Sequence, residues 1–333
     1  MPTKNYIVLS SIIELYIEIY IKLVYQIIMS FSVGIVGFPN VGKSTLFKAL
    51  TKIKVDIAPY PFTTIHPNVG VVAVPDERLD KIAEVIKPEK ITPTIIEFVD
   101  IAGLVKGAHK GEGLGNQFLA QIRNCDAILE VVRTFSDSNV ENVLGEINPE
   151  KEVEIVKVEL LMKDLETLEN LVAKLEKDAK SKDKKDIKKL ETAKKIKNAV
   201  SQGKLISEIE LDEEEKMEIK EYQFLTQKPF FYILNVNEEY IQRYILNNNG
   251  KTTYLNFPFQ HLLINLKDEE EMSELSKSEA EELKLKSQLD QLILNCYNIL
   301  DLVTFYTVAG GKETRAWTLR KGESISEAGG VVH

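Results

Sequence analysis

The chain has 333 residues, of which 44% are hydrophobic and 28% charged, and its formal net charge is −9. This length is enough for more than one domain of about 100–200 residues, and the composition is typical of a globular protein. The acidic balance argues against a protein that coats nucleic acid through bulk charge. Cys125 and Cys296 are far apart and form no CxxC pair, which favours reduced thiols over a disulfide framework or a zinc site.

The first residues combine apolar runs with scattered charges. Residues 7–28 are rich in Ile, Leu, Val and Tyr, but charged residues such as Glu14 and Lys22 interrupt the series. The pattern falls short of the ~20 apolar residues that a membrane span needs, and no small-residue cleavage site indicates a signal peptide. An interfacial amphipathic helix is the alternative. Because Met29 stands just before the first strand, we expect residues 1–30 to be an extension outside the main fold, without stable membrane insertion.

The strongest signal follows the first predicted strand, at 31–37. The segment GFPNVGKS, which ends at Lys43 and Ser44, matches the phosphate-binding pattern GxxxxGK[ST]. A predicted helix at 43–52 supplies the context that this pattern requires. Glycines let backbone N–H groups surround phosphate oxygens, and the helix start adds the positive end of its dipole. We expect Lys43 to reach the β- and γ-phosphates and Ser44 to ligate Mg²⁺.

A second ligand is expected at the end of the β-branched run 94–100. Asp100-Ile-Ala-Gly103 matches the DxxG pattern. In GTPase-like switches this aspartate holds Mg²⁺ through water, and the glycine N–H senses the γ-phosphate. Thr64, in the intervening loop, is a candidate to complete the Mg²⁺ shell, with a turn threonine as the alternative.

The residue that activates the attacking water is not obvious. Leu104 occupies the position of the glutamine that orients this water in Ras-like enzymes, so we expect slow intrinsic hydrolysis. His109, in the glycine-rich segment that follows, is a catalytic candidate, with a solvated loop histidine as the alternative.

The strand 230–235 ends in Asn235-Val236-Asn237-Glu238, where a GTPase carries N-K-x-D. Adenine has no 2-amino group and its N1 is an acceptor, so an ionised carboxylate has no partner there. Asparagine can pair with adenine N6 and N7, and the extra methylene of Glu238 would crowd a guanine. These residues favour ATP over GTP. A plain turn after a strand is the alternative.

Apolar runs at 70–74 and 127–132 add strands, which predicts a doubly wound α/β sheet of parallel strands with helices on both faces. Between 150 and 221 apolar residues recur at helical spacing, in two stripes joined by a lysine-rich link. The first stripe is Val158, Leu161, Leu165, Leu168, Val172 and Leu175, and the second is Ile187, Leu190, Ala193, Ile196 and Val200. We predict an antiparallel helical hairpin, with two surface helices of the same domain as the alternative.

Towards the end of the chain, residues 267–286 predict another amphipathic helix. From Leu302 the pattern returns to strand, with a turn at Gly310-Gly311 and a second strand in ETRAWTLRKG. A unit of about 30 residues is too small to fold alone, so we expect it to be incomplete or to pack on the rest of the chain.

Together these motifs resemble the YchF/Obg-like ATPase family. The segments that carry the resemblance are GFPNVGKST, YPFTTIHPNVG, FVDIAGLVKGAHKGEGLGNQFL, ILNVNE and ETRAWTLRKG. The resemblance implies a P-loop NTPase domain over 31–149 and 222–300, an inserted coiled-coil hairpin over 150–221, and a β-grasp (TGS) domain truncated to 302–333. It also implies a cytoplasmic ATPase that associates with the ribosome and regulates translation or stress responses. We expect a monomer that binds no DNA.

The resemblance also implies site residues. It places Mg²⁺ on Ser44 and Thr64, and Asn40 where related P-loops recruit K⁺. The family often has a histidine, proposed to assist hydrolysis, where this chain has Glu130. The ATP-binding residues would be Asn40, Val41, Gly42, Lys43, Ser44, Thr45, Asn235, Val236 and Glu238.

Two alternatives to an ATPase stay open at this point. One is a GTPase of the wider Obg group. The other is a nucleotide-sensing scaffold that binds but barely hydrolyses, which Leu104 and Glu130 both favour.

Overall fold

The structure is a computed structural model that describes residues 31–52, 68–103, 114–178, 183–239, 259–275, 277–283 and 285–332. The expected extension at 1–30 lies outside the described residues, as do Thr64, Leu104 and His109. Among the helices of the described ranges, none is long and apolar enough to cross a bilayer.

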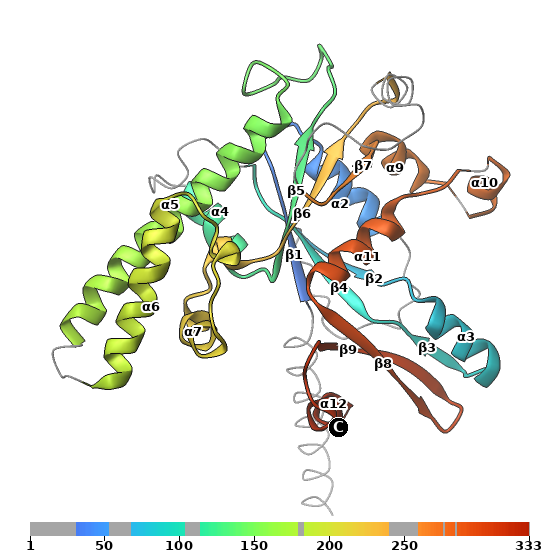
Figure 1. The fold of residues 1–333 in the computed structure, drawn as a ribbon. Helices are drawn as coiled ribbons and strands as arrows, with labels where there is room; N and C mark the ends of the chain where they lie inside the picture. Colours follow the sequence, from blue (N-terminus) through green and yellow to red (C-terminus); the bar gives the residue numbers. More distant parts are fainter. Residues whose placement is uncertain are drawn as a thin grey trace, which may run out of the picture.

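The central element is a six-stranded sheet with the strand order β2-β4-β1-β5-β6-β7 (Figure 1). Its strands are β1 (Phe31–Val36), β2 (Val69–Ala73), β4 (Ile95–Asp100), β5 (Ala127–Arg133), β6 (Phe230–Asn235) and β7 (His261–Ile264). From β4 to β7 all neighbours run parallel, whereas β2 runs antiparallel to β4. The predicted doubly wound α/β fold is confirmed, but the expectation of parallel strands throughout is wrong at one edge. An antiparallel edge strand is tolerated because a single neighbour holds it.

Helices cover both faces of this sheet. Figure 1 places α2 (Lys43–Lys52), α9 (Leu266–Met272) and α11 (Leu289–Ile299) on one side. On the other side lie α4 (Leu114–Arg123) and the first half of α5 (Pro149–Asp178). The central strands are buried on both faces, which is why they read as nearly continuous apolar runs in the sequence.

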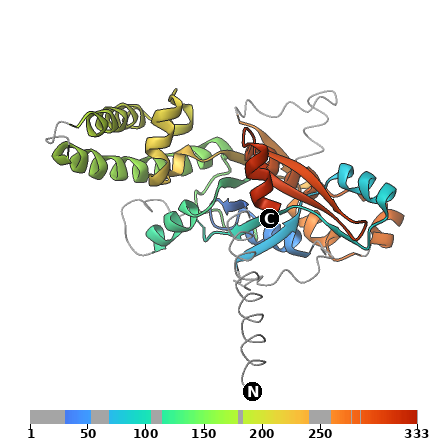
Figure 2. The ribbon, with the colours of Figure 1, turned by 90° about the horizontal axis from the view of Figure 1, so that it is seen from below.

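The second half of α5 and α6 (Lys184–Ser201) form the predicted antiparallel hairpin, which projects away from the sheet in Figures 1 and 2. Asp183 caps α6 by accepting a hydrogen bond from the N–H of Lys185 at 3.0 Å. The return path contains η3 (Ile206–Glu208), α7 (Glu213–Ile219), η4 (Lys220–Tyr222) and η5 (Leu225–Gln227). Its apolar interior includes Leu168, Leu171, Val172, Leu175, Ala193, Ile196 and Val200.

Two members of the predicted stripes are exposed: Val158 is 46% exposed and Ile187 is 40% exposed. The first half of α5 packs on the sheet through Val156 and Leu160, not on α6. An α-helix also drifts by about 20° per heptad from a strict seven-residue repeat. The a/d stripe therefore fails at Val158, near the root of the hairpin, and at Ile187, in the first turn of α6, and describes the residues between these ends.

The helix predicted over 267–286 is wrong as one element, because the chain forms α9 and then a separate short helix, α10 (Lys277–Glu282). The carboxylate of Glu269 accepts hydrogen bonds from Ser287 Oγ at 2.6 Å and from the N–H of Gln288 at 2.7 Å. A continuous helix would hold residues 269 and 287 about 27 Å apart. Closing this contact requires the chain to turn back.

The predicted C-terminal strands are β8 (Leu302–Ala309) and β9 (Glu313–Arg320), followed by α12 (Ile325–Val332). A short strand that the sequence did not indicate, β3 (Lys90–Thr92), pairs in parallel with β9 and makes a three-stranded sheet. The helix α3 (Glu77–Ile86) precedes β3 in the sequence and is capped by Asp76. The Asp76 carboxylate also accepts a hydrogen bond from the hydroxyl of Tyr306, in β8. The expectation that this unit packs on the rest of the chain is confirmed.

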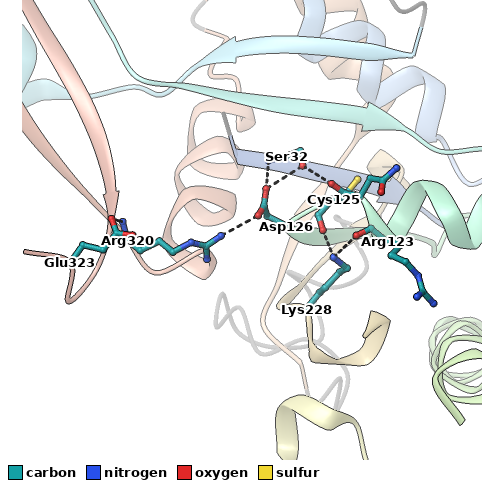
Figure 3. A network of polar contacts seen from close by, with 8 residues as sticks. Ser32, Arg123, Cys125, Asp126, Lys228, Arg320 and Glu323 are labelled. Carbon is teal, nitrogen blue, oxygen red and sulfur yellow. Dashed lines mark hydrogen bonds and ion pairs between the residues drawn. The ribbon is translucent and has the colours of Figure 1, made fainter. Parts of the chain in front are cut away.

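A polar network fastens the C-terminal strands to the amino ends of β1 and β5 (Figure 3). Asp126 accepts hydrogen bonds from the N–H and the hydroxyl of Ser32 and from the Arg320 guanidinium, the last at 3.1 Å. Beside it, Lys228 donates to the carbonyl oxygens of Arg123 and Cys125. This junction lies at the amino ends of the parallel strands, on the side of the sheet away from their carboxyl ends.

Asp164 anchors the root of the hairpin. This α5 side chain is fully buried. Its carboxylate accepts hydrogen bonds from the N–H of Leu225 at 2.9 Å and from both the N–H and the hydroxyl of Thr226 at 2.7 Å. The chain returns to β6 directly after these residues.

We predict that Asp164→Asn lowers the free energy of unfolding by about 1–3 kcal/mol, because an amide N–H₂ would replace one acceptor oxygen and leave a buried donor without a partner. Urea unfolding would measure the change. Glu166→Gln is the matched control on the same helix, since Glu166 is exposed and its ion pair with Lys163 is a surface contact. Equal stability of the Asp164→Asn variant and the wild type would contradict the anchoring role.

Candidate nucleotide site

The loop between β1 and α2 lies at the carboxyl ends of the parallel strands, where α/β folds bind ligands. Gly37 and Gly42 have positive φ angles of 144° and 107°, and Asn40 between them has a φ of 64°. A Cβ at Gly37 would lie 2.4 Å from the carbonyl oxygen of Val131. Both glycines of the motif are therefore required by backbone conformation, and also by the closeness of β5 at Gly37 and of Asn235 in β6 at Gly42.

Lys43 and Gly103 lie close together beside this loop. Lys43 is 8% exposed, and its Nζ donates a hydrogen bond to the carbonyl of Phe38 at 2.8 Å. Burial lowers the pKa of Lys43 to about 8, although the charge of Asp100 opposes this shift. A Cβ at Gly103 would lie 3.3 Å from Lys43 Nζ and 3.2 Å from the Pro39 ring. The DxxG glycine thus lies against the phosphate loop.

The two described candidates for metal ligation are in direct contact. Ser44 Oγ donates a hydrogen bond to Asp100 Oδ2 at 3.1 Å. Burial raises the pKa of Asp100, while this hydrogen bond and the charge of Lys43 lower it. Within the described ranges, no cluster of three or more His, Cys, Asp or Glu side chains suits a metal ion. A hydroxyl and a carboxylate fit Mg²⁺, which prefers oxygen ligands, keeps several waters and binds few protein groups.

Asn235 has a different role from the one its sequence position suggested. Its amide nitrogen donates a hydrogen bond to the carbonyl of Val41 at 2.8 Å, and its amide oxygen accepts one from the N–H of Leu266 at 3.3 Å. Both ends of the amide are therefore engaged with backbone, and the side chain is 6% exposed. The expectation that Asn235 pairs with adenine does not fit this geometry. Asn235 instead ties β6 to the phosphate loop.

The next residues divide between interior and surface. Val236 is 1% exposed and its N–H donates to the carbonyl of Ile264 at 3.0 Å, so its side chain offers little surface for a base contact. Glu238 is exposed and lies in a helical conformation after β6.

Glu130 is not at the phosphate loop itself. It lies in β5, is 2% exposed, and shares the α5 face of the sheet with Tyr232, its partner in the β5–β6 register. Burial and the nearby Glu152 carboxyl both raise its pKa well above the ordinary value. From Gly103 the chain continues to α4, which covers this same face (Figure 1).

The remaining predicted residues are distributed as follows. Val41 is buried and Thr45 is half-buried in the first turn of α2. Thr64 and His109 lie outside the described residues, so the structure does not place them at the site.

Sequence reasoning missed Thr134 and Arg133, which immediately follow the apolar part of β5. Thr134 donates a hydrogen bond from its hydroxyl to the carbonyl of Asn235 at 2.7 Å. Arg133 is 3% exposed and makes all its side-chain hydrogen bonds to one loop. An arginine at the end of a fully buried strand was the signal that could have identified this pair.

Comparison with known proteins agrees with this geometry. The family described as 50S ribosome-binding GTPase matches residues 32–200. The ribosome-binding ATPase YchF of Bacillus subtilis (strain 168) is 42% identical over 322 residues, which cover 92% of this chain and 85% of that protein. The protein of the same name from Haemophilus influenzae is 45% identical over 315 residues with the same coverage.

Among solved structures, the Schizosaccharomyces pombe YchF GTPase superposes with a TM-score of 0.76 at 35% identity, covering 92% of this chain and 84% of that one. The identity, the coverage and the shared fold lead to one conclusion: this chain belongs to the YchF family.

Proposed function

We propose that this chain is an ATP-hydrolysing molecular switch that associates with the ribosome and regulates translation or stress responses in the cytoplasm. The observation that carries the proposal is the meeting of Lys43, Ser44 and Asp100 at one edge of the sheet. The names of relatives that are 42% and 45% identical, ribosome-binding ATPases, support both the nucleotide and the partner. The expected monomer that binds no DNA is part of this proposal.

The division of the chain follows the same proposal. Residues 31–149 and 222–300 would form the NTPase domain, 150–221 the inserted hairpin, and 302–333 a partial β-grasp unit. The hairpin projects from the face opposite α2, which leaves it accessible to a large partner (Figure 2).

In the proposed mechanism, Lys43 exchanges the carbonyl of Phe38 for phosphate oxygens and holds the β- and γ-phosphates. Ser44, Asp100 and Thr64 would hold Mg²⁺, which neutralises charge on the phosphates when bound. The N–H of Gly103, already beside Lys43, would sense the γ-phosphate. Glu238 would face the base edge, where its extra methylene would crowd a guanine. Asn40 is the residue that would recruit K⁺, and His109 is a candidate to orient water.

A GTPase is the second candidate, favoured by the name of the Schizosaccharomyces pombe relative. We predict that calorimetry with nonhydrolysable analogues finds ATP binding tighter than GTP binding, because the extra methylene of Glu238 crowds guanine. Lys43→Ala should abolish binding of either triphosphate. Tighter GTP binding by the wild type would reject the ATPase in favour of the GTPase.

We also predict a pH dependence of ATP binding. A triphosphate needs the charged form of Lys43, whose pKa in the free protein is about 8 because of burial. Affinity should therefore be level below pH 8 and fall above it, approaching tenfold per pH unit. At pH 8.5 binding should take up protons, which calorimetry in buffers of different ionisation enthalpy detects. Lys43→Arg is the matched control, because a guanidinium stays charged across this range. A wild-type profile that stays level to pH 9.5 would contradict the assignment.

Glu130 gives a test of hydrolysis. Burial and the nearby Glu152 carboxyl raise the pKa of Glu130, which disfavours the ionised form that a general base needs. We predict that Glu130→His raises the single-turnover rate of phosphate release by about tenfold or more, because an imidazole at this position would act as a general base for the attacking water. Glu130→Gln, which is neutral and similar in shape, should leave the rate unchanged.

The same assay would be run with and without ribosomes and potassium. An unchanged rate in Glu130→His would count against a catalytic group at this position. If neither ribosomes nor potassium stimulates phosphate release, the scaffold that binds without hydrolysing becomes the better description.

A further inference from the structure

Arg133 is a buried charge whose side-chain hydrogen bonds within the described residues all go to one loop. Its Nε donates to the carbonyl of Phe135 at 3.1 Å, and its terminal nitrogens donate to the carbonyls of Asp137, Val140 and Glu141 at 3.1–3.3 Å. The guanidinium also lies 4.6 Å over the ring of Phe135. Arg133 therefore folds residues 134–141, a segment that we name the brace, around its own side chain.

One end of the brace contacts the phosphate loop directly, and the other end is connected to it through Asn235 of β6. At one end, Asn40 Nδ2 donates to the carbonyl of Glu141 at 3.3 Å, the same carbonyl that accepts from Arg133. At the other end, the N–H and the hydroxyl of Thr134 donate to the carbonyl of Asn235 at 3.1 and 2.7 Å. Asn235 in turn holds the carbonyl of Val41. The left-handed turn at Asn40 is thus fixed on both sides.

A buried hydrogen bond connects Arg133, the residue before the brace, to the start of α5. The backbone N–H of Arg133 donates to the carboxylate of Glu152, in the first turn of α5, at 3.2 Å. Both groups are buried. One hydrogen-bonded network therefore joins the end of β5 and the start of α5 to Asn40 and Val41 of the phosphate loop.

We propose that Arg133 is a positioning residue for nucleotide binding: it shapes the brace, and the brace holds Asn40 and Val41 in the conformation that surrounds a phosphate. The inference rests on the proposed function, because it concerns the same site. A lysine cannot replace this arginine, since an ammonium donates from one atom and cannot reach carbonyls spread around a planar fork.

The test compares the dissociation constant for a nonhydrolysable ATP analogue in the wild type, Arg133→Lys, Asn40→Ala and the double variant. Arg133→Lys should weaken binding by about tenfold, the equivalent of one charged hydrogen bond. The single-turnover rate at saturating ATP should not change. Because the two residues act through one carbonyl, the double variant should bind no more weakly than the weaker of the two single variants.

A merely structural role would give a different result. Loss of folded protein lowers the binding stoichiometry and leaves the dissociation constant of the folded fraction unchanged. Arg123→Lys is the matched control: this half-buried arginine also donates to a backbone carbonyl, that of Tyr222, away from the phosphate loop. Its variant should bind the analogue as the wild type does.

If Arg133→Lys does not fold, Thr134→Val tests the other end of the brace and should weaken binding by about threefold. Unchanged affinity in a folded Arg133→Lys or Thr134→Val variant, or additive losses in the double variant, would overturn the inference. A wild type that binds neither ATP nor GTP would instead reject the proposed function, so the two failures are distinguishable.

Discussion

A Cβ at Gly37 would lie 2.4 Å from the carbonyl oxygen of Val131, and one at Gly42 would lie 2.6 Å from the amide nitrogen of Asn235. The phosphate loop is therefore pressed against the ends of β5 and β6, with no space for side chains between them. This closeness lets Asn235 bond the carbonyl of Val41 and brings the brace within reach of Asn40. A loop held this way has little conformational freedom left to lose when a triphosphate binds.

The two ends of the parallel strands in the main sheet carry different sites. The carboxyl ends of the parallel strands carry the candidate site, whereas the amino ends carry the ion pair of Asp126 with Arg320 and with it the C-terminal strands. The hairpin leaves from a third direction, on the α5 face, where Asp164 fixes its root.

Local patterns carried much of this architecture. The phosphate loop, the DxxG motif and the outer hairpin could be predicted because their residue spacing is set within one element and its turn. The partners of Asn235 could not, since Val41 is 194 residues away and Leu266 is 31 residues away in the chain. The end of the helix after α9 could not be predicted either, because it depends on a hydrogen bond between Glu269 and Ser287, which is 18 residues further along the chain. β3 is three residues long and largely polar, too short for any periodicity to register.

The short strand β3 belongs to the C-terminal sheet although it lies far from β8 and β9 in the sequence. Lys90, Ile91 and Thr92 pair with Glu313, Thr314 and Arg315, so the C-terminal sheet includes residues from the first third of the chain. A recombination event with one crossover near residue 300 would join β8 and β9 to a β3 from another relative. Exchange of this unit within the family therefore requires the two segments to change together, and substitutions at 90–92 should track those at 313–315.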